Sequence, residues 1–536
     1  MKQKVLSIVI SAVVLMFSAN TIQAQTPLTT GGGPVIENCS STLSQHSWLR
    51  NDDKTANFYL NTYSPNPKLQ YQGIVTYNKS TNTAYTEEIQ LPIGYRHLYS
   101  RSCGSDYLAY YYRYNAENKT FDYSVAKIPQ KKSTEGFKQV NPEVRLSIDL
   151  TGRGEIMKYT AVSPDESMYA ITFIVPNERN QAPYFYCFIY DKNGTEVWYD
   201  KFLPTISGSK FSIQDIGLSD KGELLLLVYA TKGKNATVQS PTLQLFSCTR
   251  GNITSITEPI DYGFINSMKM LRLKNKDLFI GGYYSEDQQS NTTGYFTYIV
   301  GSDPFKITAK AHEAITYRNE VYYDGLTDKD YFIKCDYLYE QSDKIVVMLG
   351  EQHTSIQQHG DKSSMAFRHH TNDVYCNRFT LGGTDLGYIR VNKHQSAQSG
   401  LTVTTHDDGE RIGCYLFTEK RAYEKSPTFA NLNITYFPIF KDNEIYILYG
   451  DKFSNFDETS VDWEAANMEK GDENCVVLTK VDRSVDKKVV MSPSKAAQVF
   501  NSIWLIDGQD IYFGMMGKKS YTIEKFKLNK QWSWDK

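Results

Sequence analysis

The sequence predicts an all-β protein built from a repeated unit of short strands. Short apolar runs flanked by glycine or polar residues recur along the 536-residue chain, as in Asp343–Gln352, Gly222–Tyr229 and Lys276–Tyr284. Tight-turn sequences follow several of these runs. No stretch keeps the 3.6-residue apolar period of an amphipathic helix. Recurrence of one supersecondary unit over such a length is typical of a repeat protein.

The spacing of these runs indicates one large unit per repeat. Most intervals between their first apolar residues are 54 to 67 residues, and one is 100. The first residues are Leu108, Tyr169, Leu224, Leu278, Ile345, Ile445 and Ile511. The long interval contains a further run, Asp408–Phe417, which belongs either to an extra repeat or to an insertion. Val461–Glu469 is the best candidate for a short helix.

The character of the runs favours one all-β architecture. A strand with one wet face alternates apolar and polar residues, whereas Leu224–Val228 is continuously apolar and therefore buried on both faces. Radially stacked four-stranded sheets bury both faces of their middle strands. We therefore predict a β-propeller of seven or eight blades, each a four-stranded antiparallel sheet.

Hairpins are expected where glycine-containing turns separate two runs. Asp191–Gly194 has the Asn-Gly pair of a tight turn, because glycine tolerates the positive φ that such a turn requires. Corresponding turns are expected at Arg250–Asn252, Leu381–Thr384 and Asp482–Asp486.

The first 24 residues resemble a secretory signal peptide. Lys2 and Lys4 form a basic region, Val5–Phe17 an apolar core, and Ile22–Ala24 a small-residue cleavage site. The apolar core is shorter than the roughly 18–20 residues that span a bilayer. We expect residues 25–45 to be a flexible leader and residues 46–536 to form the propeller. No cysteine stands at the cleavage point, so we expect export to the periplasm or beyond without lipid anchoring.

Charge and cysteine content narrow the function classes. Loss of Lys2 and Lys4 leaves 56 basic residues against 60 acidic ones, a net charge of −4, which excludes the basic surface of a nucleic-acid-binding protein. Eight cysteines allow 105 disulfide pairings. Cys187, Cys248 and Cys376 each precede a turn in a strand-like run, so we favour buried free thiols over disulfides.

Two groups of residues carry a family resemblance. Ser163–Asp165 and the Asp191–Gly194 hairpin resemble TolB-like and WD40-like propellers. The segment from about 330 to 450 is similar to exported propellers of Bacteroidetes bacteria at Val346–Gln352, Val374–Val391 and Lys393–Gln395. The resemblance covers about half of the chain, lacks WD dipeptides, and implies a fold more than a function.

Histidines are concentrated in one region. Six of the nine lie between residues 353 and 406: His353, His359, His369, His370, His394 and His406. Clustered imidazoles can bind zinc or copper. However, no HExxH or HxH spacing fixes two ligands on one face, and residues 353–370 also resemble a polar excursion between two strands, with solvated histidines.

No motif marks a catalytic, cofactor or metal site. Glycosidases need two positioned carboxylates, and 60 acidic residues cannot be narrowed to a pair from sequence. Our leading hypothesis is an exported, non-enzymatic propeller that binds a protein or glycan at the bacterial cell envelope. The alternatives are a carbohydrate-active hydrolase with carboxylates at the propeller channel, and a metal-binding propeller that uses the histidines of residues 353–406.

Overall fold

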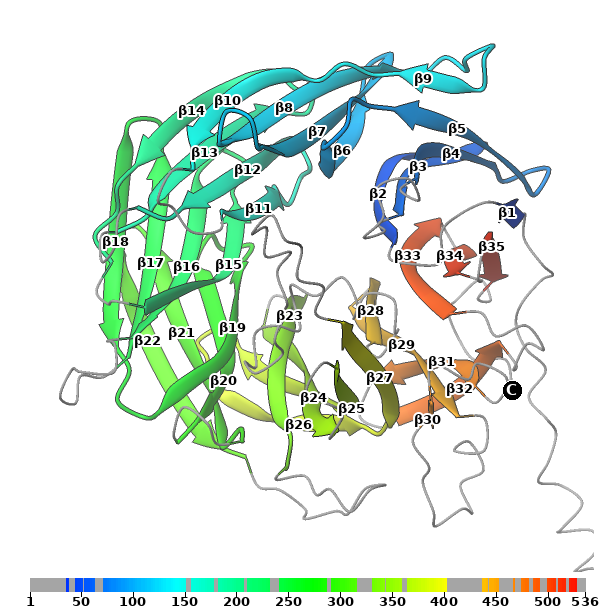
Figure 1. Ribbon diagram of the computed structural model, residues 1–536. Helices are drawn as coiled ribbons and strands as arrows, with labels where there is room; N and C mark the ends of the chain where they lie inside the picture. The colour runs from blue at the N-terminus through cyan, green and yellow to red at the C-terminus, as the bar shows by residue number, and fades with distance from the viewer. Residues whose placement is uncertain are drawn as a thin grey trace, which may run out of the picture.

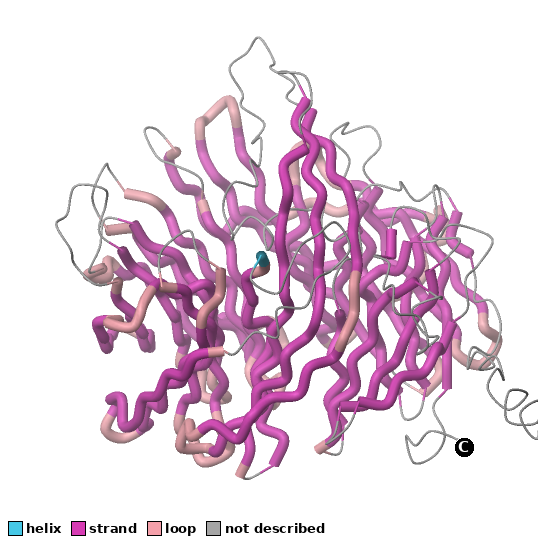
Figure 2. Tube along the Cα trace, turned by 90° about the horizontal axis from the view of Figure 1, so that it is seen from below, coloured by secondary structure: helices cyan, strands magenta, loops and turns pink. Residues whose placement is uncertain are grey.

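The structure is a computed structural model, and it confirms the predicted β-propeller. It describes residues 35–37, 44–51, 53–62, 71–150, 156–177, 182–206, 210–231, 241–286, 291–315, 330–342, 344–358, 364–402, 436–441, 443–452, 466–467, 474–481, 485–491, 499–507, 510–516 and 520–527. Strands make up most of this part of the chain, and the helical conformation in it is limited to a 3₁₀ turn at Asp330 (Figure 2). No helix among these residues is therefore long and apolar enough to cross a membrane.

Eight sheets follow one another in chain order around a ring (Figure 1). Each consists mainly of a meander whose first strand lies nearest the centre. Blade 1 has β2 (Ser44–Asn51), β3 (Thr55–Thr62), β4 (Tyr71–Asn78) and β5 (Thr83–Gln90), with β9 (Phe137–Gln139) added in parallel. Blade 2 has β6 (Arg96–Cys103), β7 (Asp106–Asn115), β8 (Thr120–Pro129) and β10 (Glu143–Asp149).

Blades 3 to 5 are regular four-stranded sheets. Blade 3 has β11 (Met157–Val162), β12 (Met168–Val175), β13 (Tyr184–Asp191) and β14 (Glu196–Phe202). Blade 4 has β15 (Lys210–Leu218), β16 (Leu224–Thr231), β17 (Thr242–Thr249) and β18 (Asn252–Pro259). Blade 5 has β19 (Phe264–Arg272), β20 (Leu278–Ser285), β21 (Gly294–Ser302) and β22 (Phe305–Ala314).

Blade 6 is the largest. It has β23 (Phe332–Ser342), β24 (Ile345–Gln358), β25 (Ser364–Thr380) and β26 (Asp385–Val391), extended by β27 (Gln395–Thr402) and β30 (Ala466–Asn467). Blade 7 has β28 (Tyr436–Lys441), β29 (Glu444–Lys452), β31 (Asn474–Val481) and β32 (Val485–Met491).

The last blade joins the two ends of the described chain. Blade 8 has β33 (Val499–Asp507), β34 (Asp510–Met516) and β35 (Ser520–Lys527), and its outer strand is β1 (Val35–Glu37), paired antiparallel with β35. The expected leader, residues 25–45, therefore contributes a strand to the ring. Strand addition satisfies the backbone groups of an otherwise open sheet edge.

The continuous apolar runs are the second strands of the blades, as the burial argument requires. On β16, Leu224, Leu226 and Val228 pack in the cluster shared with blade 3, whereas Leu225 and Leu227 pack in the cluster shared with blade 5. All seven residues that define the repeat spacing lie in second strands, those of blades 2 to 8. The second strand of blade 1, β3, was not among them.

The predicted hairpins are confirmed where the structure describes them. Asp191–Gly194 joins β13 to β14, with Gly194 at φ 76°. Arg250–Asn252 and Leu381–Thr384 lie between β17 and β18 and between β25 and β26. β31 and β32 also pair, although residues 482–484 between them lie outside the described residues.

Two smaller expectations have mixed outcomes. The candidate helix Val461–Glu469 contains β30, a short strand paired in parallel with β27, so the helix expectation is wrong at Ala466–Asn467. The extra run Asp408–Phe417 lies outside the described residues.

Tyrosines fill the spaces between blades. The chain has 40 of them, and the largest fully buried side chains are all tyrosines. Their hydroxyls form hydrogen bonds between blades, as between Tyr123 and Tyr190 (3.0 Å) and from Tyr283 to the Asn377 side chain (2.7 Å). A buried tyrosine whose hydroxyl is paired in this way adds apolar area without leaving a polar group unpaired.

The described cysteines are free thiols, as favoured from sequence. Cys187, Cys248, Cys335, Cys376 and Cys475 are buried, and Cys103 is half-buried. Cys39 and Cys414 lie outside the described residues.

Candidate functional site

The two faces of the propeller differ in the length of their chain connections. In a meander, connections alternate between the two ends of the strands. At one end they are short turns, such as residues 163–167, 219–223 and 250–251, apart from residues 130–142, which include β9. At the other end they include residues 315–331, 453–473 and the passage from β26 to β28, residues 392–435. We call these ends the short-turn face and the long-loop face. Binding residues concentrate on long loops held by a rigid scaffold.

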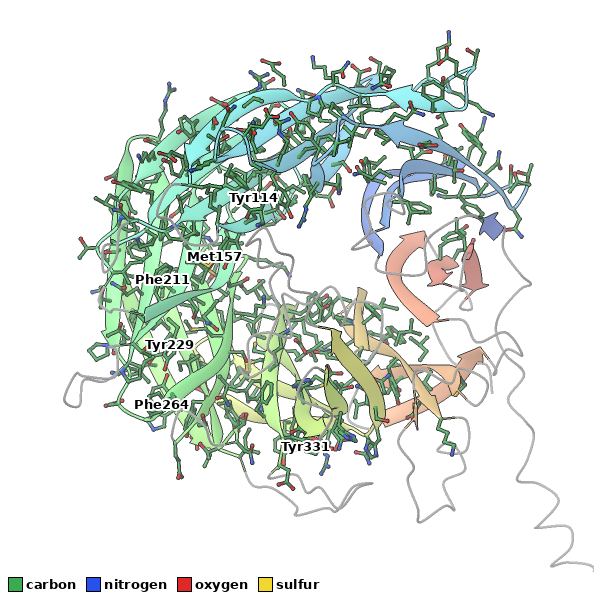
Figure 3. All side chains as sticks on the ribbon, viewed as in Figure 1. Tyr114, Met157, Phe211, Tyr229, Phe264 and Tyr331 are labelled. Carbon is green, nitrogen blue, oxygen red and sulfur yellow. The ribbon has the colours of Figure 1, made fainter. Side chains whose placement is uncertain are left out.

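Half-buried apolar side chains mark the long-loop ends of the inner strands. Met157, Phe211 and Phe264 lie at or next to the first residues of β11, β15 and β19 (Figure 3). Met157 and Phe211 pack against the core cluster between blades 3 and 4. The rim of this face is thus apolar below its connections.

Blade 6 extends further towards the long-loop face than a four-stranded unit requires. β25 pairs with β26 over residues 374–379 and with β27 over residues 364–371. β24 pairs with β25 along both of these stretches. The 100-residue interval in the sequence therefore contains an extension of one blade, followed by residues 403–435, which lie outside the described residues.

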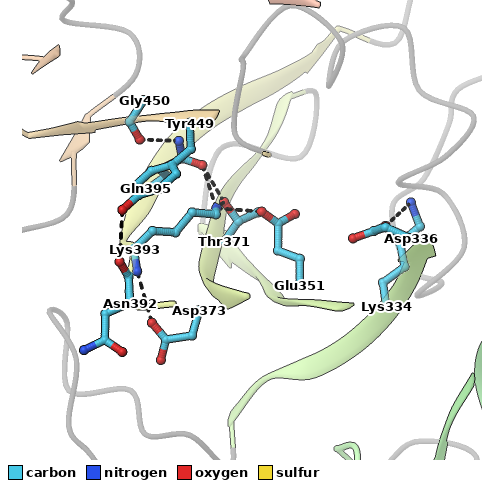
Figure 4. Close-up of polar contacts among 10 residues, drawn as sticks. All are labelled: Lys334, Asp336, Glu351, Thr371, Asp373, Asn392, Lys393, Gln395, Tyr449 and Gly450. Carbon is cyan, nitrogen blue, oxygen red and sulfur yellow. Dashed lines mark hydrogen bonds and ion pairs between the residues drawn. The ribbon is translucent and has the colours of Figure 1, made fainter. Parts of the chain in front are cut away.

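A buried polar cluster lies where this extension leaves the blade. The Lys393 cluster consists of Glu351, Thr371, Lys393 and Gln395 (Figure 4). The Lys393 side chain is 0 % exposed, and its Nζ lies 2.6 Å from Glu351 Oε1. Nζ also donates to Thr371 Oγ1 (2.9 Å) and Gln395 Oε1 (2.8 Å). All three ammonium hydrogens thus have an acceptor.

The same cluster ties blade 6 to blade 7. Gln395 Nε2 donates to the backbone oxygen of Gly450 on β29. Asp373 accepts a hydrogen bond from the Lys393 backbone N–H (3.1 Å) and pairs with Arg390. These contacts fix the short segment between β26 and β27 against two blades.

Burial changes the acid–base behaviour of the cluster. Desolvation raises the pKa of Glu351 to about 7, although the neighbouring Lys393 opposes this change. Burial, His370 and Lys393 lower the pKa of His394 to about 3. His394 is therefore neutral at physiological pH and adds no charge beside the ammonium.

The structure brings part of the histidine group together but does not leave it in solvent. His353, His370 and His394 are buried, the rings of His370 and His394 are 6.1 Å apart, and His353 contacts Phe332 edge-on at 4.9 Å. The expectation of a solvated excursion over residues 353–370 is wrong for His353 and His370, because β24 and β25 continue through that region as paired strands.

The described part of the chain does not contain a set of ligands that would support the metal-binding alternative. No group of three histidine, cysteine, aspartate or glutamate side chains there is placed to hold a metal ion. His369 lies on β25, and His359 and His406 fall outside the described residues.

The inner strands carry a recurring irregularity that sequence analysis missed. Pairing with the second strand shifts register by one residue in five blades, which leaves an extra residue on the inner strand. The extra residues are Leu49, Leu98, Gln214, Asn266 and Asp336. Such bulges redirect side chains, and they have no reliable sequence signal.

Two ion pairs lie on the inner strands of blades 4 to 6. Lys269 Nζ is 3.4 Å from Asp215 Oδ1 across blades 4 and 5, and Lys334 Nζ is 3.2 Å from Asp336 Oδ1 within blade 6 (Figure 4). Asp215 also accepts from the Met270 N–H (2.9 Å). Burial raises the pKa of Asp215, and Lys269 opposes that rise. Each of these carboxylates is balanced by a lysine.

Comparisons with known proteins add no family. No family model matches the chain, and no curated protein matches it. Similar solved structures include the β-propeller domain of the Trilobed protease from Pyrococcus furiosus (11 % identity, 66 % of this chain and 97 % of that chain covered, TM-score 0.31). Others are the polysaccharide lyase Uly1 (10 %, 90 % and 90 %, 0.34) and a protein of unknown function from Dyadobacter fermentans (10 %, 70 % and 95 %, 0.29). The fold assignment therefore rests on the sheet topology of this chain.

Proposed function

We propose that this protein is an exported, non-enzymatic β-propeller that binds a protein or glycan at the bacterial cell envelope through its long-loop face. The observation that supports the proposal most is the difference between the two faces. Short turns close one end of the blades, whereas most of the longer connections leave the other. A rigid ring that presents long connections on one side is suited to binding.

The inner ion pairs favour binding over carboxylate catalysis. A glycosidase needs one carboxyl group that donates a proton and a second that acts as a base or nucleophile. Asp215 and Asp336 are each paired with a lysine, so both carboxyl groups are already engaged in ion pairs. Export is supported by the resemblance of residues 1–24 to a signal peptide and by the likeness to exported TolB-like and WD40-like propellers.

Site-specific photo-crosslinking in the producing cells tests which face meets a ligand. The photoreactive residue p-benzoylphenylalanine would replace Asn118 or Asn392, exposed residues of the long-loop face. Lys192 and Lys221, exposed on the short-turn face, serve as matched controls. We expect crosslinked adducts from the Asn118 and Asn392 positions only. Adducts from the controls alone, or from no position, would overturn the proposal.

The mass of the chain recovered from cells tests export separately. Loss of residues 1–24 is expected, because the signal would be cleaved after Ala24. An intact N-terminus in a cytoplasmic fraction would contradict export.

A further inference from the structure

Tyr337 is an exposed aromatic residue on an innermost strand. It lies in the middle of β23, and 39 % of it is exposed. The other exposed tyrosines of the described chain lie on second or outer strands, at Tyr85, Tyr114, Tyr199 and Tyr388. Tyr337 therefore presents aromatic surface towards the centre of the ring, where neighbouring blades bury most large side chains.

The β-bulge of β23 explains this orientation. Cys335 pairs with Gly350 and Tyr337 pairs with Leu349, so Asp336 is the extra residue between them. Without it, strand alternation would place Tyr337 on the same side as Cys335, which is fully buried. The bulge thus places the charged Asp336 and the aromatic Tyr337 next to each other, and it turns Tyr337 away from the buried side of Cys335.

Blade 7 supports the ring of Tyr337. Its centroid is 6.0 Å from that of Tyr436 and 6.4 Å from that of Phe440, at interplanar angles of 73° and 65°. Phe440 is itself stacked on Tyr339 at 4.2 Å and 18°. Such edge-to-face contacts fix a ring without covering all of it. The result is an aromatic surface shared by the inner strands β23 and β28.

Balanced charges lie beside this surface. Asp336 belongs to the Lys334 pair, and both side chains are partly exposed, at 11 % and 16 %. The pair of Lys269 and Asp215 follows on the neighbouring inner strands, with 26 % and 17 % exposure. These two ion pairs therefore offer fixed donors and acceptors, and within each pair the charges cancel.

These features together fit one class of ligand. Sugar hydroxyl groups both donate and accept hydrogen bonds, and the C–H face of a pyranose ring is apolar. We propose that the inner wall formed by Lys334, Asp336, Tyr337 and Phe440 binds a neutral oligosaccharide, with Tyr337 as the stacking residue. This inference rests on the binding function proposed above and selects glycan over protein as the ligand. It places the ligand on the inner wall and not on the long-loop face itself, since Tyr337 lies mid-strand and Phe440 lies near the short-turn end of β28.

Binding of defined polysaccharides to the mature chain tests the inference. The probes are soluble xyloglucan, mixed-linkage β-glucan, galactomannan and amylose, with alginate and chondroitin sulfate as anionic comparisons, titrated by calorimetry. We expect at least one neutral probe to bind and Tyr337→Ala to weaken it about tenfold or more, the loss typical of an aromatic hot spot. Tyr337→Phe keeps the ring, so its affinity for the same probe should stay within about threefold of that of the unchanged protein, since stacking dominates.

The controls separate a local effect from a folding defect. Tyr388→Ala removes an equally exposed tyrosine (37 %) from outer strand β26 and should leave affinity unchanged. If Tyr337→Ala does not fold, Tyr337→Leu keeps apolar bulk without the ring and is measured instead. Binding that is unchanged by loss of the ring, binding of only anionic probes, or binding of none of the six would overturn the inference. Photo-crosslinks from the long-loop face in that case would leave the proposed function standing with a different ligand.

Discussion

Removal of one partner of the buried Lys393–Glu351 pair should destabilise blade 6 far more than removal of both. Lys393→Met leaves a carboxylate that is 2 % exposed, and it removes the ammonium that donates to Thr371 and Gln395, although Thr371 Oγ1 still donates to Gln395 Oε1. Loss of one member of a buried pair typically costs about 3–5 kcal/mol. Lys393→Met combined with Glu351→Leu removes both charges and should cost only about 0–2 kcal/mol, because apolar groups replace the pair.

Hydrogen exchange of amides in β24, β25 and β29 measures these costs locally. A 536-residue ring need not unfold in one step, so local opening free energies are more informative than a single melting temperature. The double-mutant cycle should give a coupling energy of at least about 2 kcal/mol. If the costs of the two single substitutions simply add in the double variant, the coupling energy is zero and the reasoning is refuted. Glu143→Gln at the exposed Arg145 pair is the control and should not change exchange measurably.

The destabilisation by Lys393→Met should also grow with pH. The pKa of Glu351 is already raised from 4.5 to about 7 in the folded chain, so folding binds a proton and stability falls as pH rises between these values. Loss of the ammonium raises that pKa further. We expect a larger loss of stability at pH 8 than at pH 6, and a pH-independent loss would contradict this account.

Three further outcomes are expected. Burial, His370 and Lys393 lower the pKa of His394 from 6.5 to about 3 in the folded chain, so the unfolded chain binds a proton that the folded chain does not. Stability should therefore fall as pH drops from 6.5 towards 3. His394→Gln should flatten this slope in denaturation midpoints measured from pH 4 to 7. Gly350→Ala should lower the free energy of unfolding by about 1–3 kcal/mol, because the added Cβ would lie 2.4 Å from a buried tyrosine ring of blade 5. Gly382→Ala is the control in the same denaturation assay. It should be neutral, because the nearest atom to its Cβ is 3.7 Å away. Burial raises the pKa of both the Cys103 and the Cys187 thiol, so exposure should decide which of them reacts. Cys103 is half-buried and should react with a maleimide in the native state, whereas Cys187 is buried and should react only after unfolding. Equal labelling rates, followed by mass spectrometry, would contradict this expectation.

Local sequence pattern predicted the repeat because its physical cause is local. A strand buried on both faces has no polar side. The continuous apolar run Leu224–Val228 therefore indicates a β-strand with a packed sheet on each of its faces. Asn193-Gly194 likewise specifies a turn through the φ that glycine permits. The start of the ring was harder to define, because β1 has only three residues and gains its partner β35 from the far end of the sequence.

The candidate site could not be predicted in the same way, because its contacts join distant residues. Glu351 and Lys393 meet only when β24 and β26 lie in one blade, and sequence offers 58 basic and 60 acidic residues from which to choose. The concentration of histidines lies in the same region of the chain as this cluster. It suggested the wrong environment, since side-chain type alone does not show that β24 and β25 continue as paired strands there.

The buried pair also bears on why blade 6 departs from the repeat. A buried ion pair contributes little stability compared with apolar residues of the same size, so net stabilisation does not account for it. A regular blade ends at its fourth strand, whereas β25 of blade 6 changes partner from β26 to β27 within one strand. Gln395, the first residue of β27, accepts from Lys393 and donates to Gly450 of blade 7, so the cluster holds the start of the extension against both blades.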